Sequence, residues 1–126
     1  MSKIKEMKKV TKEIKPWGFC STILTGENFL VKYLLINPSN CTSKQFHNYR
    51  DEYHVVLSGT GCITLDDTVH TVEKDSVIEI PRNVSHRIEN RSKDSPIEIV
   101  EFQVEEFLSD NDIVRLDDMY GRALQM

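Results

Sequence analysis

The sequence predicts an all-β domain built as a sandwich or small barrel, and three observations lead to this fold class. Short runs with strand-forming residues follow one another along the chain, turn-forming residues separate them, and no strand–helix–strand alternation is visible. The 126 residues suffice for one domain with one hydrophobic core. We expect a basic arm over 1–15 and a single domain over 16–126.

The expected strands begin after Gly18 and are short throughout. In chain order they are Phe19–Thr25, Phe29–Ile36, Tyr53–Leu57, Cys62–Leu65, Val69–Val72, Val77–Ile80, His86–Ile88 and Ile97–Gln103. Clusters of Gly, Asn, Pro, Ser and Asp separate these runs, as turns require. Asp66-Asp67 between two runs predicts a tight hairpin.

The two ends of the chain each leave two interpretations open. Residues 3–14 place apolar side chains three and four apart, which suits a short helix and equally an extended arm laid on a partner subunit. The first fifteen residues hold six lysines. A solvated arm explains them better than nucleic-acid binding, because the acidic remainder would repel a phosphate backbone. The tail over 109–126 is expected to form a strap or a short helix on the barrel.

Composition is that of an ordinary globular protein, with 39% hydrophobic residues, 29% charged residues and a net charge of −4. No apolar run approaches the roughly 20 residues that cross a bilayer, and charged residues interrupt the N-terminus where a signal peptide needs an apolar stretch. Cys20, Cys41 and Cys62 show no C-x-x-C spacing, so we expect structural thiols in a reducing, cytoplasmic setting. We expect neither a membrane nor a nucleic-acid partner.

Two segments carry residues typical of metal ligands. Gln45 and His47 are two apart, so an extended backbone points both to one face, and Glu52 enters the next strand. In the second segment a turn beginning at Pro81 delivers His86 onto a strand. Two imidazoles, one carboxylate and one amide oxygen suit Zn²⁺, Mn²⁺, Co²⁺, Ni²⁺ or Fe²⁺. The alternative is a wet cavity lined by polar side chains.

The spacing of these residues resembles the paired motifs of the cupin superfamily, H-x-H-x₃₋₄-E-x₆-G and P-x-G-x₂-H-x₃-N. This chain has Gln45-x-His47-x₄-Glu52-x₆-Gly59 and Pro81-x-Asn83-x₂-His86-x₃-Asn90. Asn83, Ser39 and Asp75 stand at glycine positions, and Asn tolerates left-handed dihedrals. The resemblance implies a cupin fold, a double-stranded β-helix or jelly-roll-like barrel, with an N-terminal arm and a C-terminal strap.

A narrower resemblance covers nearly the whole chain, which is similar to the C-terminal isomerase domain of type II mannose-6-phosphate isomerases. The matching segments are Lys15-Pro16-Trp17-Gly18, Val31-Lys32, Gln45-x-His47, Arg50-x-Glu52, Val56-x-Ser58-Gly59-Thr60, Ile80-Pro81, His86-Arg87-x-Glu89-Asn90, Pro96-x-Glu98-x-x-Glu101, Asp112-Ile113-Val114-Arg115-Leu116 and Tyr120-Gly121-Arg122. Those enzymes bind their metal through Gln, His, Glu and His. The resemblance therefore implies that Gln45, His47, Glu52 and His86 hold the ion, with Zn²⁺ expected first.

The same resemblance implies a metal-dependent aldose–ketose isomerase that interconverts mannose 6-phosphate and fructose 6-phosphate. The family pattern differs from this chain at three places. It has three consecutive histidines where this chain has His47-Asn48-Tyr49, and a His-Trp pair where this chain has Tyr53-His54. It also has an arginine at the position that Lys15 occupies here. These departures bear on the substrate more than on the fold. No nucleotide site of the guanylyltransferase that usually accompanies this domain is visible, so we expect no nucleotide-sugar synthesis from this chain alone.

Three residues are candidates for catalysis. Lys32 matches a family lysine and shares strand parity with inward apolar residues, and His54 has the parity of Glu52. Lys32, His54 or a metal-bound water would transfer the proton. The Arg50 guanidinium would donate two parallel hydrogen bonds to the phosphate. A structural interpretation stays open for each: an exposed lysine, a core histidine and a surface ion pair.

Three further residues are candidates for substrate binding. Lys15 would bind the phosphate together with Arg50. Trp17 would either form the bottom of the pocket or pack in the core. Arg87 would either contact the substrate or form a structural ion pair. Two other functions also stay open, another cupin enzyme such as a nucleotide-sugar ketoisomerase, epimerase or iron dioxygenase, and a non-catalytic sugar-binding cupin. Because a small barrel exposes strand edges that need covering, we expect a homodimer.

Overall fold

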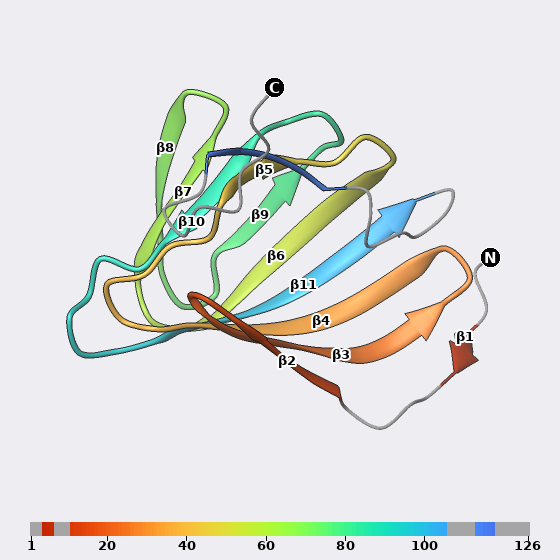
Figure 1. The fold of residues 1–126 in the computed structure, drawn as a ribbon, viewed down its shortest axis with the longest axis horizontal. Helices are drawn as coiled ribbons and strands as arrows, with labels where there is room; N and C mark the ends of the chain where they lie inside the picture. Colours follow the sequence, from red (N-terminus) through yellow and green to blue (C-terminus); the bar gives the residue numbers. More distant parts are fainter. Residues whose placement is uncertain (1–3, 7–10, 106–112, 118–126) are drawn as a thin grey trace.

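The computed structural model describes residues 4–6, 11–105 and 113–117, and its strands form two antiparallel sheets (Figure 1). The seven-stranded sheet has the order β1-β3-β4-β11-β6-β9 with β2 paired to β3, and the five-stranded sheet has the order β12-β5-β10-β7-β8. The strands are β1 Ile4–Glu6, β2 Thr11–Lys15, β3 Gly18–Gly26, β4 Phe29–Ile36, β5 Lys44–Phe46, β6 Arg50–Ser58, β7 Gly61–Leu65, β8 Thr68–Val72, β9 Val77–Ile80, β10 His86–Glu89, β11 Ile97–Glu105 and β12 Val114–Asp117. The predicted all-β class is confirmed. No helix among the described residues is long and apolar enough to cross a membrane.

All eight predicted strands are present. Four further strands among the described residues, β1, β2, β5 and β12, were not predicted as strands. Over the described part of the arm the backbone is extended, and β2 pairs with the chain's own β3 from Thr11 opposite Thr22 to Lys15 opposite Gly18. The described part of the tail forms β12, which pairs with β5. Residues 1–3, 7–10, 106–112 and 118–126 lie outside the description, and the domain boundary at 15/16 stays a prediction.

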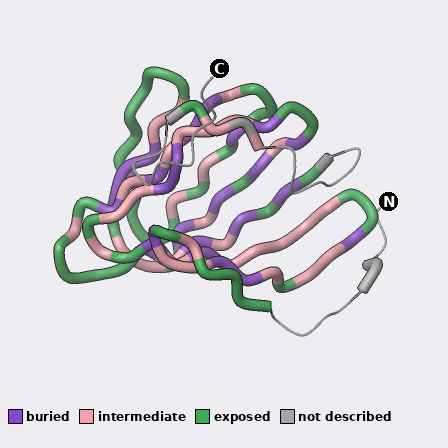
Figure 2. The backbone as a smooth tube through the Cα atoms, viewed as in Figure 1, coloured by how far each residue is buried: buried purple, intermediate pink, exposed green. Residues whose placement is uncertain are grey.

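The hydrophobic core lies between the two sheets (Figure 2). Ile36, Ile97 and Ile99 come from the seven-stranded sheet, Ile63 and Ile88 come from the five-stranded sheet, and all five are buried. Burying each such side chain stabilises the fold by about 1.5–3 kcal/mol. Strands β6 and β11 alternate buried and more exposed residues, so their inward positions are shared between this core and the cavity described below.

Within the described ranges, left-handed backbone occurs at four non-glycine residues, and each lies in a turn or loop between strands. Ser39, Asp75 and Asn83 have φ angles of 60°, 75° and 68°, so these residues adopt the conformation for which cupins use glycine at the same positions. Asp66 has φ 49° in the predicted hairpin between β7 and β8. Its Oδ1 also accepts hydrogen bonds from the Ser85 amide and hydroxyl, which ties the hairpin to the residue before His86.

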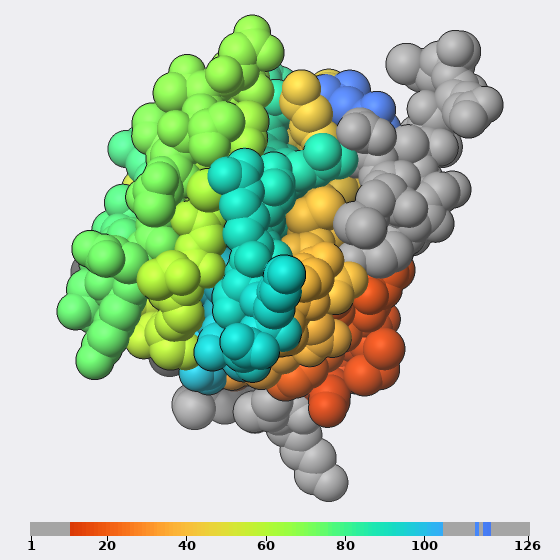
Figure 3. Space-filling model, turned by 90° about the vertical axis from the view of Figure 1, so that its left-hand side faces the viewer, coloured from red at the N-terminus to blue at the C-terminus, as the bar shows by residue number. Residues whose placement is uncertain are grey.

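The last residue of the second motif, Asn90, holds two loops together. Its side-chain amide donates to the carbonyls of Ile36 and Ser95 at 3.0 and 2.8 Å, and its backbone N–H donates to the carbonyl of Asn40. Figure 3, which views this end of the molecule, shows the loop after β10 beside the loop after β4. These contacts reach backbone groups of the two loops, so the role of the buried Asn90 side chain is structural.

Gly59 is the glycine of the first motif, and its position excludes a side chain. Its φ is 88°, and an added Cβ would lie 2.5 Å from the Pro96 carbonyl oxygen. We expect Gly59→Ala to lower the free energy of unfolding by about 2–4 kcal/mol, because left-handed strain and the backbone clash act together. Urea unfolding measures the effect, with Thr60→Ala at the neighbouring exposed residue as the control. An unchanged midpoint for Gly59→Ala would contradict this role.

Candidate metal centre

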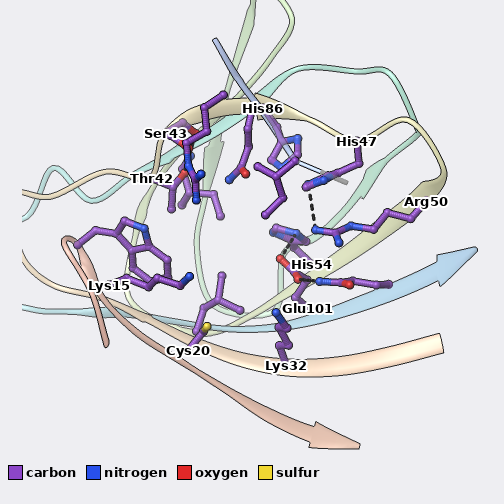
Figure 4. Close-up of a pocket in the computed structure, with 17 residues that line it drawn as sticks. Lys15, Cys20, Lys32, Thr42, Ser43, His47, Arg50, His54, His86 and Glu101 are labelled. Atoms are coloured by element: carbon purple, nitrogen blue, oxygen red, sulfur yellow. Dashed lines mark hydrogen bonds and ion pairs between the residues drawn. The ribbon is translucent and has the colours of Figure 1, made fainter. Parts of the chain in front are cut away.

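A cavity opens between the two sheets (Figure 4). Its walls come from both sheets and from the segments next to β5 and β12. Its lining is formed by Lys15, Trp17, Cys20, Lys32, Leu34, Thr42, Ser43, Gln45, His47, Arg50, His54, His86, Ile88, Glu101, Gln103, Ile113 and Arg115.

Strand register in the seven-stranded sheet explains why polar side chains gather here. Glu101 on β11 lies opposite Lys32 on β4 and opposite His54 on β6, so these three residues form one row across three strands. In the next row on the same face, Gln103 lies opposite Glu52. Because opposed residues of antiparallel strands project to the same side, both rows project to the cavity side of the sheet.

Three of the four predicted metal ligands meet at one point on the cavity wall. Donor atoms of His47, Glu52 and His86 all lie within 4.8 Å of one another, and each residue is at most 4% exposed. His47 Nε2 lies 2.8 Å from Glu52 Oε2, and His86 Nε2 lies 3.8 Å from Glu52 Oε1. The fourth, Gln45, also lines the cavity and pairs in register with His86 across β5 and β10.

This donor set fits a divalent transition metal ion. Two imidazole nitrogens, a carboxylate and an amide oxygen are ligands that such ions accept, with bonds of about 2.0–2.2 Å. His86 Nδ1 donates to the Val84 carbonyl at 3.3 Å, which leaves Nε2 as the lone-pair nitrogen facing the other donors. Burial lowers the pKa of His86 to about 4, so its ring is neutral at pH 7, as a metal ligand must be. A backbone hydrogen bond from Asn83 to the His47 carbonyl joins the two motifs.

Arg50 brings a positive charge directly against these donors. Its Nε donates to Glu52 Oε2 at 2.9 Å, its Nη2 lies 3.2 Å from His47 Nε2, and the residue is 5% exposed. Burial alone would raise the pKa of Glu52, but hydrogen bonds from His47 and His54 hold that pKa well below its usual value. The carboxylate is therefore charged in this site, and Arg50 neutralises part of that charge.

A second cluster shares Glu52 with the first and extends it towards β11. His54 Nε2 lies 2.9 Å from Glu52 Oε1 and 3.2 Å from Glu101 Oε1, and Gln103 donates its amide to Glu101 Oε2. Burial alone would lower the pKa of His54, but the hydrogen bonds to Glu101 and Glu52 raise it to about 9. Burial and repulsion from Glu52 act to raise the pKa of Glu101, yet His54 and Arg50 lower it overall.

The structure brings most of the other predicted residues to the cavity. Lys15, Trp17 and Lys32 line it, and Lys15 Nζ lies 3.2 Å from Glu13 Oε1. Trp17 is 6% exposed and belongs to the hydrophobic core as well. Arg87 is not among the lining residues, and its Nε donates to the Thr42 carbonyl at 3.3 Å.

Sequence reasoning assigned no role to Glu101 and Gln103, and it named Arg115 only within a segment that matches the family. Glu101 and Gln103 share the strand parity of the buried residues Ile97 and Ile99, and polar residues at core positions are the signal that could have revealed them. Arg115 lies on β12, whose pairing with β5 the sequence did not predict. Cys20, treated as structural, also lines the cavity, and burial raises the pKa of its thiol to about 11.

Comparison with known proteins identifies the family of this chain. The family model described as Mannose-6-phosphate isomerase C-terminal matches residues 2–118. The chain is 35% identical to the xanthan biosynthesis protein XanB of Xanthomonas campestris pv. campestris over 96% of its own length, and 35% identical to a mannose-1-phosphate guanylyltransferase of Salmonella muenchen over 92%. It spans 29% and 24% of those proteins.

Solved structures of low sequence identity show the same fold. A cupin-2 domain from Rhodospirillum rubrum superposes with a TM-score of 0.68 at 14% identity, and the match covers 82% of this chain and 78% of that one. The two-sheet architecture, the clustering of His47, Glu52 and His86 from the two motifs and the family match over most of the chain agree with one another. This chain belongs to the mannose-6-phosphate isomerase C-terminal family of cupin domains.

Proposed function

We propose that this domain is a divalent-metal-dependent aldose–ketose isomerase that interconverts mannose 6-phosphate and fructose 6-phosphate. The observation that carries the proposal is the buried set of His47, Glu52 and His86, which lies beside a cavity lined by several charged and polar side chains. The family to which the chain belongs supports the same activity. We place Zn²⁺ first as the metal, and Mn²⁺, Co²⁺, Ni²⁺ or Fe²⁺ fit the same donors.

Isomerisation moves a proton between two adjacent carbons through a cis-enediolate. A bound divalent ion would supply Lewis-acid stabilisation of the negative charge that develops on the two oxygens. The base takes the proton from the carbon next to the carbonyl, and the electron pair forms the carbon–carbon double bond while the carbonyl oxygen is protonated. Return of a proton to the other carbon, with loss of the hydroxyl proton, completes the reaction.

The row of Lys32, Glu101 and His54 is the proposed proton-transfer group. His54 Nε2 lies 3.2 Å from Glu101 Oε1, and all three residues line the cavity next to the proposed metal ligands. A positioned acid–base group typically contributes about 10²–10⁴-fold to the rate. Because its pKa is raised to about 9, His54 is protonated at pH 7 and is assigned to proton donation, with Glu101 or Lys32 as the base.

The guanidinium of Arg50 contacts metal-ligand candidates, whereas the sequence analysis expected it to bind the phosphate of the substrate. Because its guanidinium is shared between Glu52 and His47, we assign it to charge stabilisation beside the reacting oxygens. Lys15 and Trp17 line the cavity and remain candidates for substrate contact. Arg87 holds Thr42 and is assigned a structural role.

A coupled assay with mannose 6-phosphate tests the proposed activity. The purified protein is assayed as isolated, after chelation, and after addition of Zn²⁺, Mn²⁺ or Co²⁺, and exchange of the C2 hydrogen with deuterated solvent is followed in parallel. We expect turnover and exchange that disappear on chelation and return with metal. Metal-loaded protein that shows neither would favour a non-catalytic sugar-binding cupin or another substrate.

We also propose that the chain forms a homodimer. The outer face of the seven-stranded sheet exposes apolar side chains on neighbouring strands, including Tyr53 and Leu57 on β6 and Phe102 and Val104 on β11, and Phe102 lies opposite Tyr53. Contiguous apolar residues of this kind are typical of interaction surfaces. Light scattering is expected to give the mass of a dimer at tens of micromolar, and Phe102→Lys is expected to lower it. A monomer under these conditions would contradict the proposal.

A further inference from the structure

Three buried polar atoms have no hydrogen-bond partner among the described residues, and all three belong to side chains that line the cavity. They are His54 Nδ1, Gln103 Oε1 and Arg115 Nε. Leaving a buried polar atom unsatisfied costs about 1–3 kcal/mol, so such atoms are rare in folded proteins. Their concentration in one cavity indicates that a polar ligand completes them.

The chemistry of Gln103 specifies one end of that ligand. Its amide nitrogen donates to Glu101 Oε2, and only the nitrogen can face a carboxylate oxygen in this way, so the orientation of the amide is fixed. Oε1 is then a buried acceptor that needs a donor, and the residue is 1% exposed. A hydroxyl group is the neutral donor that fits, beside a second open position at His54 Nδ1.

Arg115 specifies the other end. Its Nε is a charged donor that needs an acceptor, and it lies on β12 of the five-stranded sheet, opposite Gln45 of β5. Gln103 belongs to the facing seven-stranded sheet, so the two open positions come from opposite walls. Lysine and arginine side chains among the described lining residues are Lys15, Lys32, Arg50 and Arg115, and Glu101 is the single Asp or Glu among them. This balance favours an anion, and Arg50 is already engaged by Glu52 and His47.

We propose that Gln103 and Arg115 recognise a polyol that carries an oxyanion such as a phosphate: Gln103 Oε1 accepts a hydrogen bond from a hydroxyl, and Arg115 Nε donates to the anionic group. The assignment deepens the proposed function, on which it rests for the nature of the sugar, and it places the phosphate contact on β12 instead of at Arg50. Both residues are binding residues and take no part in the proton transfer.

Calorimetric titration with three unreactive probes tests the assignment: mannitol 1-phosphate, mannitol and inorganic phosphate. None of them can be isomerised, because none has a carbonyl group. We expect Arg115→Met to weaken binding of mannitol 1-phosphate by about 10–150-fold, as for a lost charged hydrogen bond, and to leave mannitol unchanged. Arg115→Lys should recover part of the loss. Gln103→Met should weaken mannitol and mannitol 1-phosphate by about 2–10-fold and leave inorganic phosphate unchanged.

Arg91→Met provides the matched control, because Arg91 is exposed, pairs with Glu89 and does not line the cavity. Thermal unfolding of each variant identifies any that has lost its fold, and Arg115→Lys then keeps the test decisive. Equal losses on mannitol and mannitol 1-phosphate in Arg115→Met, or wild-type binding by both variants, would overturn the proposal. If the binding pattern holds and mannose 6-phosphate is not turned over, the isomerase proposal fails and this assignment stands.

Discussion

Replacing Glu52 by glutamine is expected to lower the free energy of unfolding of the chelated protein by about 3–5 kcal/mol. The Glu52 carboxylate lies within 2.9 Å of donor nitrogens of Arg50, His47 and His54, and the residue is 1% exposed. Glutamine has a similar shape but no charge, so it leaves the buried guanidinium of Arg50 without its counter-charge. It also removes the only carboxylate among the predicted metal ligands, so we expect metal binding to be lost.

Urea unfolding in the presence of a chelator measures the stability effect without any contribution from metal. Glu79→Gln is the matched control, because Glu79 lies exposed on β9, and its substitution should change the free energy of unfolding by less than about 0.5 kcal/mol. A change equally small for Glu52→Gln would mean that the buried charge network contributes nothing to stability.

Replacing His86 by alanine is expected to abolish metal binding and to lower kcat/KM for mannose 6-phosphate by about 10³-fold or more. His86 provides a neutral imidazole whose Nε2 faces the other donors, and Lewis-acid stabilisation is worth several kcal/mol, at about 1.36 kcal/mol for each tenfold in rate. Elemental analysis and the coupled assay, carried out on the same preparation, give the two readouts.

His70→Ala serves as the control for this substitution, since His70 lies exposed on β8 and outside the cavity lining. It should keep both metal and turnover. If His86→Ala bound a full equivalent of metal and remained active, the ion would lie elsewhere in the chain.

The local geometry of the two motifs could be predicted because neighbouring residues determine it. Two residues at spacing two on a strand share a face, and the turn at Asn83 needs a residue that tolerates φ near 68°. Strand parity predicted a common face for Gln45 and His47, the resemblance to cupins implied that His86 joins them, and all three line the cavity. Hairpin formation at Asp66 follows from the same kind of local rule.

The partners of those residues could not be predicted, because long-range pairing determines them. His54 and Glu101 lie far apart in the chain and meet only because β6 pairs with β11. Strand β5 has three residues, Lys44–Phe46, and β12 has four, too few for a periodic pattern to be recognised, so the place of Arg115 opposite Gln45 was invisible in the sequence. The contact of Arg50 with His47 likewise depends on how the chain turns between β5 and β6.

Locating bound metal tests the site most directly. The chelated protein is titrated with Zn²⁺ by calorimetry, and crystals of the loaded protein are examined by anomalous scattering at the zinc edge. We expect one ion per chain, bound between Gln45, His47, Glu52 and His86, with no binding in His86→Ala. A folded protein that takes up no ion at saturating Zn²⁺, Mn²⁺ or Co²⁺, or an ion found away from these four residues, would contradict the metal centre.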